Sequence, residues 1–106
     1  MSYRYMRVIV MFDLPVLTDS ERRDYTKFRK YLIKNGFLMM QESIYSKLAQ
    51  NQTAADLIVE NIKKNKPSKG IVQVMKITEK QYAKIECIVG ETNKEVIDSD
   101  ERLIIL

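Results

Sequence analysis

The sequence predicts one α+β domain, in which an antiparallel sheet carries two helices on one face. Three observations lead to this expectation. Several short runs are rich in β-branched and apolar residues, as strands are. Two longer segments place apolar residues at helical spacing, each beginning near a threonine suited to capping a helix. The predicted order of strand, helix, strand, helix, strand is typical of the split βαβ, or ferredoxin-like, sandwich.

The first strand is expected at residues 7–12 (RVIVMF), because an almost wholly apolar run indicates a strand at the centre of a sheet. Asp13 follows at once. The Leu14-Pro15 pair then turns the chain, since a residue before proline is pushed out of helical geometry.

The first helix is expected to start at Thr18, which forms a capping box with Glu21. Tyr25, Phe28 and Leu32 recur at spacings of three and four and therefore face the core. The other face is basic and carries Arg23, Lys27, Lys30 and Lys34. Asn35-Gly36 is a typical helix stop.

The middle of the chain is expected to give one strand and one helix. Residues 37–48 indicate a strand that is bent or bulged near Gln41-Glu42, where the apolar run gives way to alternation. A second capping box, Thr53 with Asp56, opens a helix that runs to about residue 65. The inward-facing residues of this helix are expected to be Leu57, Ile58 and Ile62.

The last third of the chain predicts a strand at Ile71–Thr78 and, after a turn at 79–81, a further strand at 85–89. Residues 82–87 fit one or two turns of helix equally well. The apolar run at 103–106 suits a terminal strand that pairs with another chain's sheet edge. We therefore expect a domain at 1–90, followed at 91–106 by a linker and a strand that completes a homodimer.

Composition excludes several classes of enzyme. With no histidine and only Cys87, the chain lacks a histidine acid or base, a Cys-His pair and the ligands of a conventional zinc site. No glycine-rich phosphate loop is present. No run of about 20 apolar residues is present either, so we expect a cytoplasmic protein with no membrane contact.

The charge distribution favours a nucleic-acid partner. Residues 1–90 hold sixteen Lys or Arg against nine Asp or Glu, whereas residues 91–106 hold two against five. The basic helix face could neutralise phosphates, although an ordinary solvated helix face has the same pattern. Aromatic residues do not interleave with these charges, so contact with a duplex backbone is favoured over stacking on single strands.

Asp13 is the main candidate for metal chemistry. A carboxylate at the end of an apolar strand could hold hydrated Mg²⁺, and two copies side by side in a dimer would make a shared, weak site. The alternative is an aspartate that only accepts backbone hydrogen bonds in the turn before Pro15.

Five segments carry a resemblance to a known family: RVIVMFDLP at 7–15, ERRDYTKFRKYLIKNGF at 21–37, Gln-x-Ser-Ile-Tyr at 41–45, TEKQ at 78–81 and the ending SDERLIIL. In order and spacing they resemble the small CRISPR-associated adaptation protein, a component of spacer acquisition also called a CRISPR-associated endoribonuclease. The likeness is greatest to the variant that accompanies the single large guide-RNA effector nuclease.

The resemblance implies a ferredoxin-like homodimer that joins two integrase dimers and holds duplex DNA for insertion into a CRISPR array. The large effector nuclease is a further candidate partner. The resemblance also makes Asp13 the metal ligand, for Mg²⁺ or Mn²⁺, and the candidate catalytic residue of a nuclease. For phosphate contact we select, by charge and predicted position, Arg7, Arg22, Arg23, Lys27 and Lys30. The expected dimer or integrase interface is Leu103, Ile104, Ile105 and Leu106.

Three functions therefore compete. A DNA-binding adaptor is favoured, because one carboxylate with no neighbouring acid or base provides few of the groups that a nuclease needs for catalysis. A metal-dependent endonuclease acting on RNA or duplex DNA, with a toxin-like role outside immunity, is the alternative. A regulatory module that binds a small molecule at its dimer interface is a third, because this fold hosts many functions.

Overall fold

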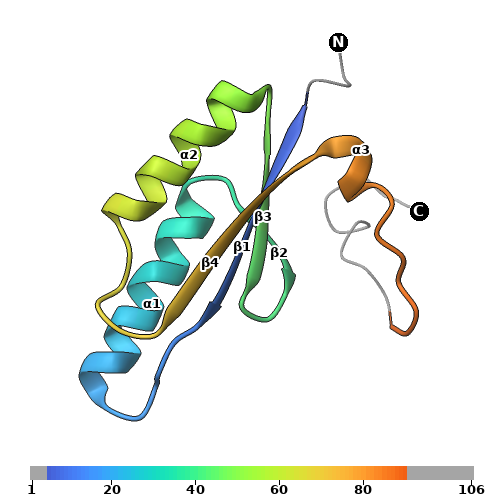
Figure 1. Cartoon of the computed structure of the whole chain (residues 1–106). Coiled ribbons are helices and arrows are strands. Elements are labelled where there is room, and N and C mark those ends of the chain that lie inside the picture. The colour runs from blue at the N-terminus through green and yellow to red at the C-terminus, as the bar shows by residue number, and fades with distance from the viewer. Residues whose placement is uncertain (1–4, 91–106) are drawn as a thin grey trace.

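The computed structural model describes residues 5–90 as a four-stranded antiparallel sheet with two long helices on one face (Figure 1). The strand order is β2-β3-β1-β4. This is the predicted α+β, ferredoxin-like arrangement. Its elements, in chain order, are β1 (Met6–Asp13), α1 (Asp19–Lys34), β2 (Leu38–Gln41), β3 (Ile44–Ala49), α2 (Gln52–Lys64), β4 (Ile71–Thr78) and the short α3 (Glu79–Tyr82).

Strand β1 is central, as predicted, and its alternate residues divide the sheet into two faces. Val8, Val10 and Phe12 are buried and form a core with Phe28 and Leu32 of α1, among other residues. Successive side chains of a strand point to opposite faces. Met6 shares the core face, and the alternate β1 residues lie on the face turned away from α1 and α2, which we call the open face: Arg7, Ile9, Met11 and Asp13.

Helix α1 begins and ends where the sequence indicates. The Thr18 hydroxyl accepts a hydrogen bond from Glu21 N–H at 3.1 Å, and the Glu21 carboxylate accepts one from Thr18 N–H at 3.1 Å. At the other end the Lys47 ammonium donates to the carbonyl of Asn35 at 2.5 Å, where it also faces the negative end of the helix dipole. Phe28 and Leu32 are fully buried, and Tyr25 packs beside them.

The prediction of one bent strand at 37–48 was wrong, because this segment is a hairpin of two strands. Chain reversal occurs at Glu42 and Ser43, and Ser43 has a φ of 67°. The irregularity expected near Gln41-Glu42 is present as a register shift between Met39 and Gln41. The polar residues that suggested a bulge therefore form a turn, and the hairpin supplies the fourth strand of the sheet.

The start of α2 also differs from prediction. The cap is Asn51, whose side-chain oxygen accepts from Ala54 N–H at 2.8 Å, rather than Thr53. Asp56 instead accepts from the Lys76 ammonium at 2.6 Å, and this hydrogen bond lowers the pKa of its carboxyl. Leu57 was expected inside but is 63% exposed. Ile62 is buried and Ile58 packs against the core, as predicted.

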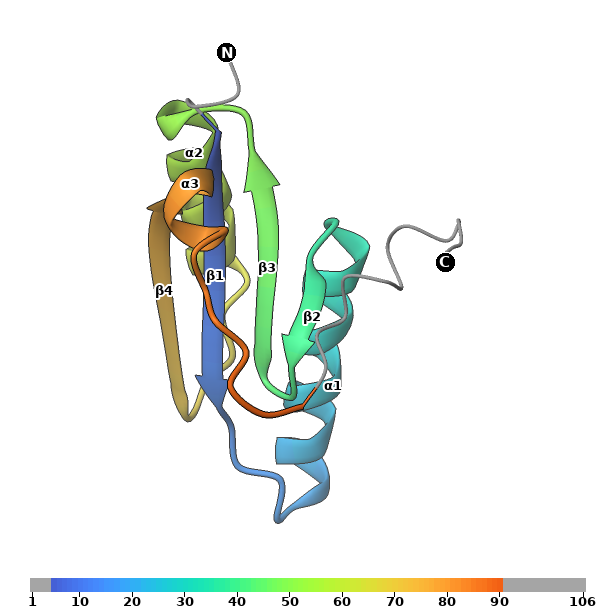
Figure 2. The ribbon, with the colours of Figure 1, turned by 90° about the vertical axis from the view of Figure 1, so that its right-hand side faces the viewer.

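The chain after β4 is not the predicted strand. The expected turn at 79–81 is the helical turn α3, capped by Thr78 and Gln81. Residues 85–89 form neither strand nor helix, and the fourth strand of the sheet is β2 instead. Residues 83–90 are all exposed, and Figure 2 shows this segment crossing in front of the open face. The strand predicted at 103–106 and the linker at 91–102 lie outside the described residues.

Candidate nucleic-acid interface and the environment of Asp13

A row of cations runs along α1 on the side away from the core. Arg23, Lys27, Lys30 and Lys34 follow one another at spacings of four, three and four, and we call them the basic stripe. With a rise of 1.5 Å per residue, the stripe is about 16 Å long. A surface hollow of about 680 Å³ is lined by Asp19, Arg22, Arg23, Thr26, Lys27 and Lys30. Four of the five predicted phosphate-contacting residues therefore lie together.

The charge of the stripe is not neutralised by the acidic residues of α1, because those residues contact other partners. Asp19 pairs with Arg22, and Asp24 accepts from the Ser68 hydroxyl at 3.0 Å. Glu21 completes the helix cap and lies 3.9 Å from the Lys69 ammonium. Within residues 5–90, no ion pair involves any member of the stripe. Its cations are therefore available to an external anion.

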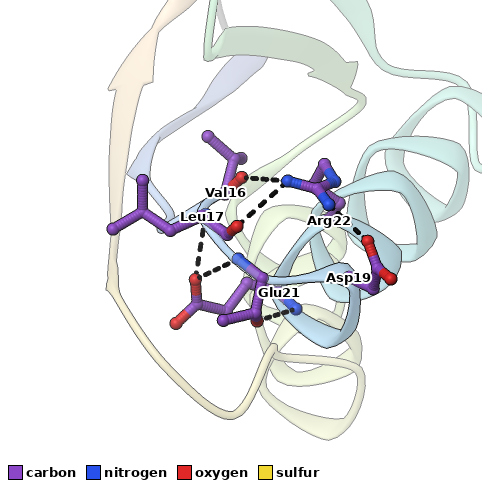
Figure 3. Close-up of polar contacts among 6 residues, drawn as sticks. Val16, Leu17, Asp19, Glu21 and Arg22 are labelled. Carbon is purple, nitrogen blue, oxygen red and sulfur yellow. Dashed lines mark hydrogen bonds and ion pairs between the residues drawn. The ribbon is translucent and has the colours of Figure 1, made fainter.

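Arg22 differs from the stripe because its guanidinium is engaged locally (Figure 3). It donates to the carbonyls of Val16 and Leu17 at 3.0 and 3.1 Å, and to the carboxylate of Asp19. These bonds hold the connection between β1 and α1. Arg22 thus lines the hollow but also has a structural role that the sequence did not predict.

Arg7 lies apart from the other four residues, on the open face. It donates two hydrogen bonds to the carboxylate of Glu79, at 2.9 and 2.7 Å, and its guanidinium carbon is 4.2 Å from the ring centroid of Tyr82. The Arg7 side chain is 15% exposed. Its charge is therefore compensated within the chain. An arginine in an otherwise apolar central strand was the signal in the sequence that a partner had to exist.

Asp13 is the last residue of β1, exposed, and opposite Ile71 of β4. Its position is tied to Gly70, where an added Cβ would lie 2.7 Å from the Asp13 carbonyl oxygen. Carboxylate oxygens suit Mg²⁺, but in the described part of the chain no group of three or more His, Cys, Asp or Glu residues could hold a metal ion. Within residues 5–90, Asp13 is therefore not part of such a cluster, and waters or phosphate oxygens would have to complete the shell of a metal ion bound to it.

The open face is apolar and partly exposed, although residues 83–90 cross in front of it and Ile9 is only 4% exposed (Figure 2). Four apolar side chains of this face are 43–58% exposed. One is on β2, one on β3 and two on β4: Leu38, Leu48, Ile71 and Met75. Residues 85–89 add Ile85, Ile88 and Val89, which are exposed by 55%, 83% and 89%. Exposed apolar patches of this kind mark sites of association. None of the helices among residues 5–90 is long and apolar enough to cross a membrane.

Fold and site together define a small ferredoxin-like protein with a basic outer helix and an apolar sheet face. A crystal structure described as Cas2 has the same fold, with a TM-score of 0.57 and 18% identity over 94% of this chain and 99% of that one. The family model described as CRISPR associated protein Cas2 matches residues 6–85. The chain belongs to this CRISPR-associated family.

Curated relatives agree with this assignment over almost the full length. A CRISPR-associated endoribonuclease Cas2 from Treponema denticola is 58% identical over 95% of this chain and 100% of that protein. Proteins with the same name from Streptococcus mutans and Ligilactobacillus salivarius are 44% and 46% identical, each over 95% of this chain, and over 93% and 100% of their own lengths. The predicted family is therefore confirmed.

Proposed function

We propose that this chain is an adaptor of CRISPR spacer acquisition, which self-associates, joins integrase dimers and binds duplex DNA through phosphate contacts. The observation that carries the proposal is the basic stripe of α1, whose cations have no acidic partner within residues 5–90. Membership in a CRISPR-associated family makes nucleic acid the natural anion.

The form of the stripe supports contact with the sugar-phosphate backbone of a duplex. Lys27 and Lys30 are flexible point charges that attract phosphate without reading base identity. Stacking on unpaired bases requires exposed aromatic rings beside the charges. The aromatics of α1 that flank the core, Tyr25 and Tyr31, pack against it instead. Binding is therefore expected to depend on charge and salt rather than on sequence.

Self-association is supported by the open face. Its exposed apolar side chains and those of residues 85–89 belong to the same chain, so a two-fold pair of copies would bury both surfaces at once. Such a pair would carry its two basic stripes on the outside, because α1 covers the opposite face of the sheet (Figure 1). A contribution from 103–106 to this pairing stays a prediction.

The DNA contact can be tested by the salt dependence of binding to a short duplex. Removing Lys27 and Lys30 together as Lys27→Ala and Lys30→Ala should weaken binding and reduce the slope of log K against log salt by about two, since each phosphate contact contributes about 0.9. The matched control is Lys80→Ala with Lys84→Ala, which removes the same charge from exposed positions after β4. Equal losses in both pairs would contradict a specific role for the stripe.

The adaptor role can be tested by reconstituted integration with the cognate integrase, a short duplex donor and an array plasmid. We expect integration to require this protein and to persist with Asp13→Ala. Equal integration without the protein would remove the proposed role. Loss with Asp13→Ala alone would move the assignment toward metal chemistry.

The nuclease alternative is favoured by one observation, namely that the relatives are named endoribonucleases. On this reading Asp13 would hold Mg²⁺ or Mn²⁺ together with the second copy's Asp13, and the metal would polarise the scissile phosphate. The reading predicts cleavage of RNA or duplex DNA that needs the metal and is abolished in Asp13→Ala. Cleavage at the same rate by that variant would exclude it.

A further inference from the structure

Arg7 makes the most specific side-chain contact that joins the end of the described chain to its start. Its planar guanidinium matches the Glu79 carboxylate in a two-point hydrogen bond, with Nε to Oε1 at 2.9 Å and Nη2 to Oε2 at 2.7 Å. Arginine alone among the cations offers this forked geometry, which a lysine cannot reproduce. The contact therefore fixes an orientation as well as a distance.

Two further contacts strengthen the attachment of α3 to β1. The Arg7 guanidinium lies over the ring of Tyr82, 4.2 Å from its centroid, in a cation–π arrangement. The backbone N–H of Glu79 donates to the carbonyl of Tyr5 at 2.9 Å. We call the three side chains Arg7, Glu79 and Tyr82 the clamp.

A helix of one turn is not stable by itself, and the clamp adds to the capping box of Thr78 and Gln81 that already holds the four residues of α3. The orientation of α3 sets the direction in which residues 83–90 leave it, because the first residues of this segment donate hydrogen bonds to the carbonyls of α3. Figure 2 shows that the segment then passes in front of β1 and β3. Its apolar side chains Ile85, Ile88 and Val89 remain exposed.

We propose that Arg7 is a positioning residue, which through Glu79 and Tyr82 sets the path of residues 83–90 and so presents Ile85, Ile88 and Val89 to a second copy of this chain. This inference rests on the self-association in the proposed function. The occupant is a second copy because the same chain carries both the apolar segment and the exposed apolar sheet face. Arg7 then acts in assembly and does not bind phosphate.

The test compares hydrogen exchange with self-association in four forms of the full chain. Arg7→Lys keeps the charge and loses the fork, whereas Glu79→Gln loses the charged acceptor. The charge-reversed pair Arg7→Glu with Glu79→Arg rebuilds the ion pair. Lys80→Ala is the control, because it removes a cation from the same turn without touching the clamp. Circular dichroism confirms that each form is folded.

Exchange reports on the clamp in the single chain, at a concentration below self-association. The informative amides are those of Ala83, Lys84 and Ile85, which donate to the carbonyls of Glu79, Gln81 and Tyr82. We expect roughly tenfold faster exchange at these amides in Arg7→Lys and Glu79→Gln, since local opening becomes easier. Lys80→Ala should match the original chain, and the charge-reversed pair should recover part of the protection.

Sedimentation equilibrium then reports on assembly. The proposal expects weaker self-association, by roughly tenfold or more, in the two variants with fast exchange, and partial recovery in the reversed pair. Unchanged exchange, or fast exchange with unchanged self-association, would overturn it. If the original chain does not self-associate at all, the proposed function fails at that step and takes the inference with it, whereas the exchange data still show the clamp.

DNA binding separates positioning from phosphate contact. Glu79→Gln releases the Arg7 charge, so a phosphate-binding Arg7 would give tighter duplex binding and a steeper salt slope. The control is Glu86→Gln, which makes the same change of charge at an exposed position. Tighter binding by Glu79→Gln than by Glu86→Gln would overturn the assignment. Equal or weaker binding supports it.

Discussion

At the scale of single residues, Gly70 allows the chain to pass close to the backbone of Asp13. It has a φ of +91°, and a Cβ there would stand 2.7 Å from the Asp13 carbonyl oxygen and 2.8 Å from a Leu14 methyl group. Gly70→Ala should destabilise the fold by about 2 kcal/mol or more, since left-handed strain and a backbone clash add together. Urea unfolding measures the loss.

Gly90 provides a matched control for this prediction. Its φ is +94°, but no atom lies within 4 Å of its Cβ position. Gly90→Ala therefore adds the backbone strain without the clash, and we expect a cost of about 1 kcal/mol or less, because an exposed segment relaxes. Equal costs at the two glycines would show that the contact with Asp13 is unimportant.

The carboxyl of Glu21 makes the stability of the fold depend on pH. The hydrogen bond from Thr18 N–H is the largest cause that lowers the pKa of this carboxyl from its usual 4.5, and Leu17 N–H and Lys69 act in the same direction. A lowered folded-state pKa means that the ionised cap stabilises the fold above pH 4.5 and that this contribution is lost as the pH falls through the folded-state pKa.

Glu21→Gln tests this dependence because glutamine keeps the acceptor oxygen and removes the charge. The original chain should be more stable than the variant near neutral pH, and the difference should shrink on acidification below pH 4.5. Thermal unfolding of both forms over this range measures it. A difference that does not change with pH would contradict the assigned role of the carboxylate.

The contacts of Arg7 show why single-residue roles were the hardest to predict. Arg7 was selected for phosphate contact by its charge and its predicted position. Its partner Glu79 is 72 positions away, and nothing local in the sequence links the two. The basic stripe was predictable because its members lie on one helix, where spacing alone determines the face.

At the scale of elements, the start of α2 can be tested, because the structure caps this helix with Asn51 and the sequence predicted Thr53. Asn51 accepts the hydrogen bond of Ala54 N–H, whereas Thr53 lies inside the first turn. Asn51→Ala should cost about 1 kcal/mol, and Thr53→Ala less than about 0.5 kcal/mol. Chemical unfolding of the two variants decides between them, and the reverse order would restore the original prediction.

Elements with local signals were predicted well, and those that depend on distant pairing were not. Strand β1, both long helices and β4 follow from periodicity, and α1 also from its capping box. The hairpin at 37–48 was missed because its turn contains no glycine and uses Ser43 at positive φ. Residues 85–89 have strand-forming composition, but a strand needs a neighbouring strand, and among the described residues they pair with neither edge of the sheet.

At the scale of the whole molecule, the two sides of the sheet are expected to respond differently to charge. Met75→Glu places a carboxylate on the open face and should weaken self-association by roughly tenfold or more. Leu57→Glu is the control, because Leu57 is 63% exposed on α2, on the opposite side. Sedimentation velocity compares them, and equal sedimentation would refute pairing through the open face.

The exposed segment after α3 also makes the molecule easy to observe. Cys87 lies in this segment, is exposed, and is the sole cysteine of the 106 residues. Within residues 5–90 its thiol donates to the carbonyls of Val89 and Gly90 nearby, so a bulky group attached there leaves the core undisturbed. A maleimide dye would therefore label a single site without any mutation. Because Cys87 stands between Ile85 and Ile88, a dye attached there should obstruct the proposed pairing, so labelled and unlabelled chains should differ in self-association.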